Sequence, residues 1–308
     1  MWFKNLIVYR LKSNWTIEAD NLEKKLSRQP LQPCGSFEME TRGWICPQSE
    51  GPFLHTLNGQ WLLALGVDQK LLPASVIRQV TQERAAEIAR KQAHSIGRKQ
   101  MRDIREQVAR ELMPRALSRR RTTWAWIDPA HKWLVVDAAG DAKAEQLLET
   151  LRRADLDFPL KRLETQRSPA SAMTHWLSAG NLSADFTIDQ DLELRSSDEN
   201  KATVRYVRHA LEGKEIRDHI ATGKSATRLA LTWKDRISFV LTEQLQIKRL
   251  AFLDILKQEP GTQTEDEHEQ FDIDFALMTG ELALFLADLV KALGGEKLHE
   301  DRALAATA

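Results

Sequence analysis

The side chains whose types and spacing most clearly suggest a binding function are the arginines and lysines of residues 76–121. This segment has thirteen Lys and Arg against five Asp and Glu, although the formal net charge of the whole chain is zero. Many guanidinium and ammonium groups in one segment suit contact with an extended polyanion, whereas a small anionic substrate needs only one or two. The compensating charge lies in residues 254–301, where thirteen Asp and Glu stand against three Lys. The separation of a basic segment from an acidic one predicts a polyanion-binding surface on one side of the protein.

A second basic segment, residues 201–228, has seven Lys and Arg against three Asp and Glu. Within it, Arg208 and His209 stand where a predicted strand turns back toward a predicted helix. A loop at such a position can reach toward a groove or a phosphate group. An ordinary solvent-exposed turn explains the same pattern, and the sequence leaves both interpretations open.

A nucleotide-binding loop is suggested by Gly223-Lys224-Ser225, but the pattern is incomplete. It requires another glycine five residues before Gly223, where Asp218 stands. The strand that should precede the loop is also missing, because residues 214–221 predict a helix that ends at Gly223. NTPase activity is therefore a weak alternative.

Metal-dependent catalysis has equally little support. His268-Glu269 lacks the histidine three residues further on that a zinc-peptidase pattern requires. Asp272 and Asp274 would point to the same side only if that segment were extended. We therefore expect no enzyme, with no catalytic, cofactor-binding or metal-ligating residue. A metal-dependent nuclease that uses Asp272 and Asp274 is the less favoured alternative.

Aromatic side chains offer a different way to bind nucleic acid. Trp124 and Trp126 alternate in a predicted strand that follows three consecutive arginines, and single-strand-binding proteins stack bases on such platforms. Most of the nine tryptophans, however, stand in apolar segments, which favours core packing. A single-stranded nucleic-acid-binding module that uses Trp124 and Trp126 is kept as an alternative.

The overall composition is that of a folded chain. With 308 residues, of which 42% are hydrophobic and 29% charged, we expect about two domains. No segment approaches the roughly 18 apolar residues of a membrane span. Residues 1–9 lack the features of an export signal, so the expected location is the cytoplasm. Cys34 and Cys46 have no metal-ligand spacing and are expected to be packing thiols.

Hydrophobic periodicity and turn residues place these side chains on alternating elements. The predicted elements are strand 2–11, helix 16–27, strands 43–47 and 60–67, two helices within 76–114, strands 124–127 and 133–137, helix 142–153, helix 173–178, strands 184–194 and 203–208, helix 214–221, strands 228–233, 237–242 and 247–252, and helix 272–293. Strands 124–127 and 133–137 are expected to form a hairpin.

The basic segment is predicted to be a helical arm. Gly97 divides it into two helices, and a short basic turn at residues 115–121 leads back into a strand. The second helix has an apolar stripe at helical spacing, formed by Met101, Ile104, Val108 and Leu112.

These elements indicate an α+β fold in which the arm is inserted between strands of one sheet. We expect residues 1–75 and 122–168 to form a discontinuous centre domain. Residues 76–121 would form the helical tip arm, and residues 169–308 a base domain.

Several segments, in order along the chain, closely resemble the RdgC family of recombination-associated proteins. They are WFKNLIVYRL at 2–11, PCG at 33–35, LP at 72–73, MPRALSR at 113–119, WID at 126–128, LALTW at 229–233 and FDIDFALMTGEL at 271–282. The resemblance extends from residue 1 to about residue 296.

The resemblance implies a non-enzymatic protein of the nucleoid that binds double-stranded DNA without sequence preference. Each subunit of that family is a horseshoe with a centre domain, a helical tip and a base. Two subunits join at both ends into a ring around the duplex. Members of the family restrain RecA-promoted strand exchange, so the implied partners are duplex DNA, a second copy of the chain and, as a functional antagonist, RecA.

The charge pattern and the resemblance together nominate the binding residues. By position, the resemblance places Leu117 in the tip-to-tip dimer interface, and it places Arg208 with His209 on a loop that reaches toward DNA. Family members more commonly have an aromatic residue at the first position and a Lys-Gln pair at the other two. The full expected set of DNA contacts is Arg98, Lys99, Arg102, Arg115, Arg119, Arg120, Arg121, Lys201, Arg205, Arg208 and His209.

Overall fold

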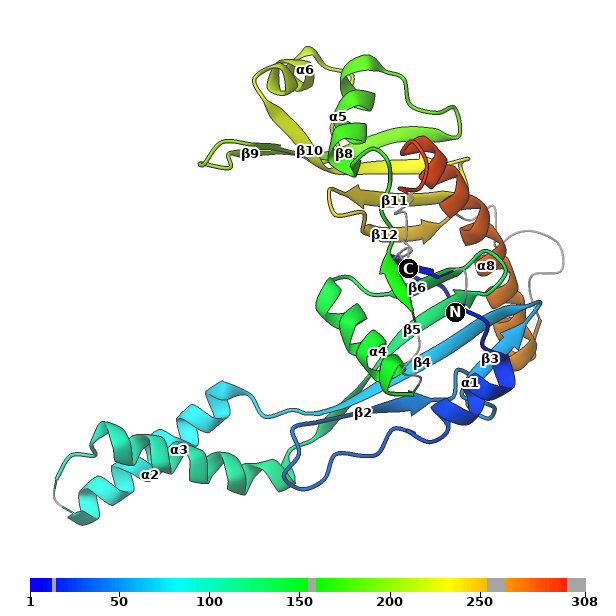
Figure 1. Ribbon diagram of the computed structural model, residues 1–308. Coiled ribbons are helices and arrows are strands. Elements are labelled where there is room, and N and C mark those ends of the chain that lie inside the picture. Colours follow the sequence, from blue (N-terminus) through cyan, green and yellow to red (C-terminus); the bar gives the residue numbers. More distant parts are fainter. Residues whose placement is uncertain (13–14, 93, 155–158, 254–263, 298–308) are drawn as a thin grey trace, which may run out of the picture.

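The computed structural model describes residues 1–12, 15–92, 94–154, 159–253 and 264–297, and it confirms the α+β class. Its main feature is one antiparallel sheet of twelve strands, flanked by helices (Figure 1). None of the helices in these ranges is long and apolar enough to cross a membrane.

The strands are β1 (Leu6–Leu11), β2 (Glu40–Ile45), β3 (Leu54–Leu57), β4 (Gln60–Lys70), β5 (Ser118–Asp128), β6 (Trp133–Asp137), β7 (Leu160–Arg162), β8 (Phe186–Ser196), β9 (Thr203–Tyr206), β10 (Lys224–Trp233), β11 (Ile237–Thr242) and β12 (Ile247–Phe252). The helices are α1 (Ala19–Leu26), α2 (Ala74–Gln92), α3 (Arg98–Leu112), the short 3-10 helix η1 (Met113–Arg115), α4 (Asp141–Ala154), α5 (Pro169–Ala179), α6 (Lys214–Ala221) and α8 (Glu267–Ala292). Strands β3 and β7 were not predicted from the sequence, and α1 begins later than expected.

The sheet has two halves that meet at a narrow seam. Its strand order is β2-β4-β5-β6-β1-β12-β11-β10-β8-β9, with β3 on β4 and β7 on β1. We call β1–β7 the centre half and β8–β12 the base half. The two halves join where β1 pairs with β12 through one register pair, Leu6 with Ile247. Next to it, the backbone N–H of Leu250 donates to the carbonyl of Lys4 at 2.8 Å.

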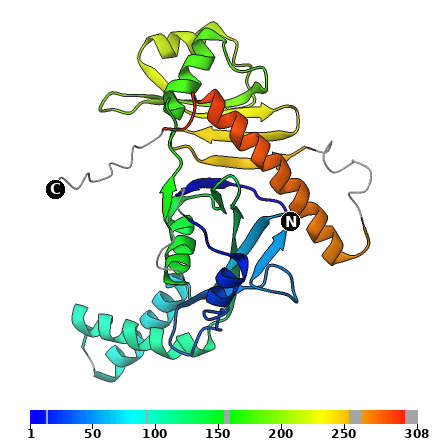
Figure 2. The same ribbon diagram turned by 45° about the vertical axis from the view of Figure 1, so that its right-hand side comes forward.

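The two faces of the sheet are covered unequally. In β1, Leu6 and Val8 point into one hydrophobic core and Ile7 and Tyr9 into another, because successive side chains of a strand alternate. Helices α5, α6 and α8 cover the first face, and α8 runs across both halves (Figures 1 and 2). Helices α1 and α4 cover the other face only in the centre half. In the described part of the chain, the base half has no helix on that second face, which we call the open face.

Helix α8 forms where the sequence predicted the last helix, although it begins five residues earlier, at Glu267 rather than Asp272. Asp266 caps it by accepting hydrogen bonds from the backbone N–H groups of His268 and Glu269. Gly294, with a φ of 86°, follows the helix in a backbone conformation that favours glycine and ends it, as expected.

The arm consists of α2 and α3, which lie between the paired strands β4 and β5. The two helices pack through Ala85, Ile104 and Val108, and Gly97 caps the start of α3. The apolar stripe was wrong at Met101, which stays 36% exposed and outside this cluster. The arm leaves the sheet at the end of β4 and returns at the start of β5, and these two strands pair along their whole length.

The predicted basic turn at residues 115–121 was partly wrong. Only η1, which ends at Arg115, and the two residues after it precede the sheet, and β5 begins at Ser118. Arg119, Arg120 and Arg121 therefore lie in a strand, opposite Gln69, Asp68 and Val67 of β4. Backbone hydrogen bonds to β4 extend this strand. Because β4 lies far away in the sequence, local composition does not reveal this pairing.

The arm and the β8–β9 end of the base half project from opposite ends of the sheet in the same direction, with α4 between them (Figures 1 and 2). In the view of Figure 1, α5 and α6 lie above the base strands. The open face therefore looks toward the space between the base half and the arm.

The packing of α8 can be tested at Phe285. This side chain is fully buried, and its ring lies 4.8 Å from that of Phe239 and 5.8 Å from that of Trp233. Phe285→Ala should lower the free energy of unfolding by about 3–5 kcal/mol, because it leaves a cavity between helix and sheet. Leu284→Ala removes the neighbouring side chain, which is 60% exposed, and should cost less than about 1 kcal/mol. Equal losses in urea denaturation would contradict the assigned faces of α8.

Candidate nucleic-acid interface

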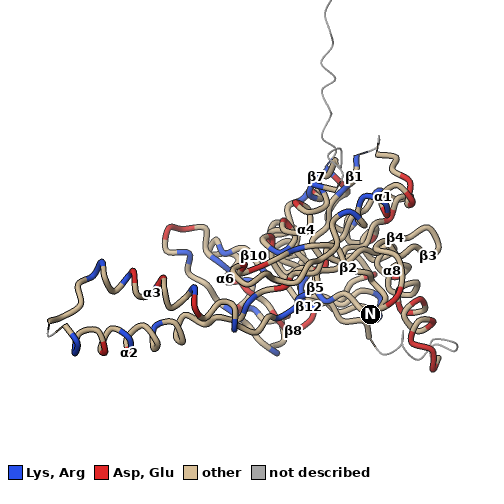
Figure 3. The backbone as a smooth tube through the Cα atoms, turned by 90° about the horizontal axis from the view of Figure 1, so that it is seen from below, with Lys and Arg blue, Asp and Glu red and all other residues tan. Residues whose placement is uncertain are grey.

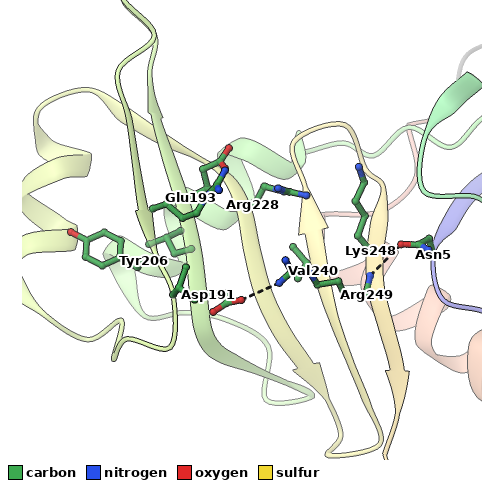
Figure 4. A pocket seen from close by; sticks show the side chains of 11 residues that line it. Asn5, Asp191, Glu193, Tyr206, Arg228, Val240, Lys248 and Arg249 are labelled. Carbon is green, nitrogen blue, oxygen red and sulfur yellow. Dashed lines mark hydrogen bonds and ion pairs between the residues drawn. The ribbon is translucent and has the colours of Figure 1, made fainter. Parts of the chain in front are cut away.

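The open face of the base half is polar because its strands alternate. In β8, Leu192 and Leu194 point into the core, so Asp191, Glu193 and Arg195 point to the open face. Neighbouring strands add further charged side chains to the same face (Figure 4), namely Arg205, Arg228, Lys248 and Arg249. The open face thus carries a layer of cations among fewer carboxylates.

Glu193 holds two of these cations in place. Its carboxylate is buried, with its side chain 7% exposed, and accepts hydrogen bonds from Arg205 at 2.6 Å and Arg195 at 3.3 Å. The hydroxyl of Thr227 donates to it at 2.9 Å. Burial alone would raise the pKa of Glu193, but the bonds from Arg205 and Thr227 outweigh it and lower the pKa below its usual range. Glu193 therefore stays ionised and ties β9 to β8.

Asp191 fixes the loop that carries Arg208 and His209. Its carboxylate accepts the backbone N–H of Arg208 at 3.0 Å and the guanidinium of Arg249 at 3.3 Å. The backbone N–H of His209 donates to the carbonyl of Gln190 at 3.1 Å. Arg208 has a φ of 53°, a strained conformation for a residue other than glycine, and these bonds maintain it.

The side chains of this loop remain accessible. Arg208 and His209 are exposed, and the ring of His209 lies 5.3 Å from that of Tyr206 at the end of β9. Lys201 is exposed in the β8–β9 turn, and Arg205 keeps 63% of its side chain exposed while bound to Glu193. The structure thus brings the expected residues of the base half onto one hairpin and its following loop.

The arm presents a second group of cations. Lys and Arg recur along α2 and α3, with fewer Asp and Glu between them (Figure 3). Arg98, Arg102 and the additional Arg105 follow one another at helical spacing on one flank of α3. These three, with Lys99 and Arg115, are exposed, and none of them forms an ion pair with another described residue.

The three consecutive arginines of β5 do not form one surface. Because the register with β4 is regular, Arg119 and Arg121 point to the face that α1 and α4 cover farther along the sheet, and Arg120 points to the other. The guanidinium of Arg121 donates to the side-chain oxygen of Gln69. All three are exposed, but a single ligand surface cannot contact them equally.

Leu117 lies at the root of the arm and is 78% exposed. Its carbonyl accepts the backbone N–H of Leu71 at 2.7 Å, and the N–H of the preceding Lys70 donates to the carbonyl of Met39. Leu71 is also exposed, at 43%. We call Leu71 and Leu117, which lie opposite each other just beyond the paired ends of β4 and β5, the arm-root patch.

The residues of the alternative functions are engaged elsewhere. Trp126 is fully buried and its indole N–H donates to Gln60 at 2.8 Å, so it cannot stack on a base, while Trp124 packs partly against the core. Asp272 accepts a hydrogen bond from Gln48 at 3.0 Å, and Asp274 pairs with the amino group of Met1 at 2.5 Å. Within the ranges that the structure describes, no three His, Cys, Asp or Glu side chains are grouped to hold a metal ion. Gly223 ends α6 with a φ of 89°, as predicted.

Comparison with known proteins identifies the family. A family model described as "Putative exonuclease, RdgC" matches residues 1–296. The chain belongs to the RdgC family. It is 52% identical to "Recombination-associated protein RdgC" of Dechloromonas aromatica over 299 residues, which cover 96% of this chain and 98% of that protein. The RdgC proteins of Janthinobacterium sp. and Herminiimonas arsenicoxydans are each 51% identical and cover 96% of this chain and 99% of their own length. The resemblance seen in the sequence is thus confirmed.

Most cations of the open face were not among the residues predicted from the sequence. Arg195, Arg228, Lys248 and Arg249 lie in strands, and only Arg228 stands in a segment that the charge count selected. The alternation of side chains along each strand could have predicted which cations share this face. Register shifts between β8 and β10 and between β11 and β12 interrupt that alternation.

The role of Glu193 predicts a specific pH dependence. Because its pKa in the folded chain lies below its ordinary value of 4.5, the ionised carboxylate stabilises the fold above that pH. This contribution is lost as the pH falls through the folded-state pKa. Wild type should therefore exceed Glu193→Gln in free energy of unfolding at neutral pH, and the difference should shrink in acid. Urea denaturation measures it, with Glu199→Gln, an exposed carboxylate of the same hairpin, as the control. A difference that does not change with pH would contradict the prediction.

Proposed function

We propose that this chain binds double-stranded DNA without sequence preference and encircles it as a homodimeric ring. The observation that carries the proposal is that Lys and Arg gather on two groups of elements, the arm and the open face of the base half. These elements project in one direction and border the same space (Figure 1). A duplex carries one negative charge per about 1.7 Å of axis, so a long polyanion in that space can contact both groups.

In this proposal the subunit is a horseshoe. Residues 1–75 and 122–168 form its centre domain, residues 76–121 the tip and residues 169–308 the base. Exposed arginines and lysines contact phosphate groups, which position the duplex without reading its bases. The expected contacts are those nominated by the sequence, with Arg105 added from the structure.

The names of the relatives, recombination-associated proteins, support a role in recombination. We infer that the ring occupies duplex DNA in the nucleoid and so restrains RecA-promoted strand exchange. Occupancy alone suffices for such restraint, because a duplex held inside a ring is less accessible to a recombination filament. The proposal requires no cofactor, metal ion or catalytic residue.

Duplex binding should weaken steeply with salt. Each neutralised phosphate contributes a slope of about −0.9 to the logarithm of affinity against the logarithm of salt concentration. Fluorescence anisotropy on duplexes of unrelated sequence should give equal affinities and equal slopes. On closed circular duplex, dissociation should be slower than on linear duplex of the same length, since a ring can leave a linear molecule by its ends. A flat salt response or a strong sequence preference would contradict the proposal.

The arm-root patch should contribute to the dimer. Leu117→Asp places a charge where the proposal buries an apolar side chain worth about 1.5–3 kcal/mol. The dimer dissociation constant should rise roughly 10- to 100-fold, as measured by sedimentation over a range of concentrations. Met101→Asp, on the exposed side of α3 in the same arm, is the control and should leave the dimer unchanged. Equal dissociation constants for wild type and Leu117→Asp would remove Leu117 from the interface.

The description of the matching family model as an exonuclease favours that activity as a second candidate function. Incubation of end-labelled duplex with the protein and Mg²⁺ would show shortened products if the chain is an exonuclease. Loss of these products in Asp272→Asn would support the nuclease. The single-strand alternative predicts instead that oligo-dT, and not duplex, quenches tryptophan fluorescence.

A further inference from the structure

A small pocket lies on the open face, close to the seam between the two halves. It has a volume of about 250 Å³ and is formed by strands β8 to β12 together with Asn5, just before β1 (Figure 4). Val240 of β11 forms part of its floor, and Arg228 and Lys248 stand on the strands on either side. The pocket can admit a single polyatomic group but not a duplex.

The charges in this pocket are only partly compensated. Four of its lining residues are cationic, Arg205, Arg228, Lys248 and Arg249, and two are anionic, Asp191 and Glu193. Glu193 binds Arg205, and Asp191 binds Arg249. Arg228 and Lys248 form neither an ion pair nor a side-chain hydrogen bond with any residue in the described ranges.

Two cations in one hollow that have no salt bridge or side-chain hydrogen bond within the described residues are suited to bind an anion, and Glu193 attracts Arg228 only through space. Arg228 and Lys248 are each half-buried, so water screens their charges less than at a fully exposed site. Figure 4 shows both side chains on the same side of the sheet, with the guanidinium of Arg228 extending from β10 toward β11. An anion that reaches both side chains gains charge-assisted hydrogen bonds from each of them.

The direct contacts of the two carboxylates go to other groups, because each holds an arginine and a neighbouring backbone or hydroxyl group. Asp191 also accepts the N–H of Arg208, and Glu193 the hydroxyl of Thr227. They fix the walls of the pocket and leave Arg228 and Lys248 for a ligand. The arrangement fits a tetrahedral oxyanion, which a guanidinium binds through two oxygens and an ammonium as a point charge.

We propose that this pocket is a seat for one backbone phosphate group of nucleic acid, bound by Arg228 and Lys248. The inference rests on the proposed function and adds a site near the middle of the molecule to contacts expected on the arm and the Arg208 loop. A duplex lying along the open face would insert one phosphate into the pocket. The seat therefore fixes how close the duplex approaches the sheet.

The test is the double variant Arg228→Gln with Lys248→Gln. Its control is Lys214→Gln with Arg217→Gln, which removes the same two charge types from α6, on the helix-covered face. The seat variant should reduce the salt slope of duplex binding by roughly 1–2 and weaken binding about equally for all sequences. The control should retain the wild-type slope. Arg228→Lys should also retain the slope, because the charge is kept, but it should lose part of the affinity with the second hydrogen bond. Circular dichroism and urea denaturation verify that each variant is folded.

Inorganic polyphosphate and inorganic phosphate serve as further ligands and separate the possible outcomes. If wild type binds duplex and the seat variant binds it with the same slope, the seat is wrong while the proposed function stands. If wild type fails to bind duplex but binds polyphosphate through Arg228 and Lys248, the site is a phosphate-binding site and the proposed function fails. Binding of inorganic phosphate as tight as that of polyphosphate would assign the pocket to a free anion and overturn the seat. If neither duplex nor polyphosphate binding depends on these residues, the inference is wrong.

Discussion

The structure depends on the requirement that a sheet cover its apolar faces. Helix α8 covers one face across the seam, and its contacts reach from Phe3 in the centre half to Phe239 in the base half. Helices α1 and α4 cover the second face of the centre half alone. The second face of the base half is consequently exposed to water and must be polar. The base half thus has a polar open face because α1 and α4 cover only the centre half.

Carboxylates on the open face hold arginines in place, but they are too few to neutralise all the positive charge of that face. The carboxylate of Glu193 accepts hydrogen bonds from Arg205 and from the hydroxyl of Thr227. The carboxylate of Asp191 accepts hydrogen bonds from Arg249 and from the backbone N–H of Arg208. A buried carboxylate that lost these partners would destabilise the fold, so the same bonds that stabilise β9 also orient its exposed side chains. Stability and the presentation of positive charge are therefore coupled in this region.

Local sequence patterns predicted what local interactions decide. The two helices of the arm, the cap at Gly97, the β5–β6 hairpin and the body of α8 all follow from periodicity and turn residues. Arg119 to Arg121 were misplaced because their strand exists through pairing with β4, whose residues lie far away in the sequence. For the candidate site, the loop at Arg208 was found, but Arg228 and Lys248 were not. Which cations lack a partner depends on contacts between strands, and no local count of charges contains that information.

The attachment of the arm has a consequence for how such a chain can diversify. Lys70 and Ser118 are register partners, so the arm leaves and re-enters the sheet at neighbouring positions. An insertion with adjacent ends imposes no change on the strands that carry it, whatever its length. The arm can lengthen, shorten or exchange its surface while β4 and β5 keep their pairing. The sheet is thus a fixed frame, and the arm is a module whose reach can be adjusted independently of the frame.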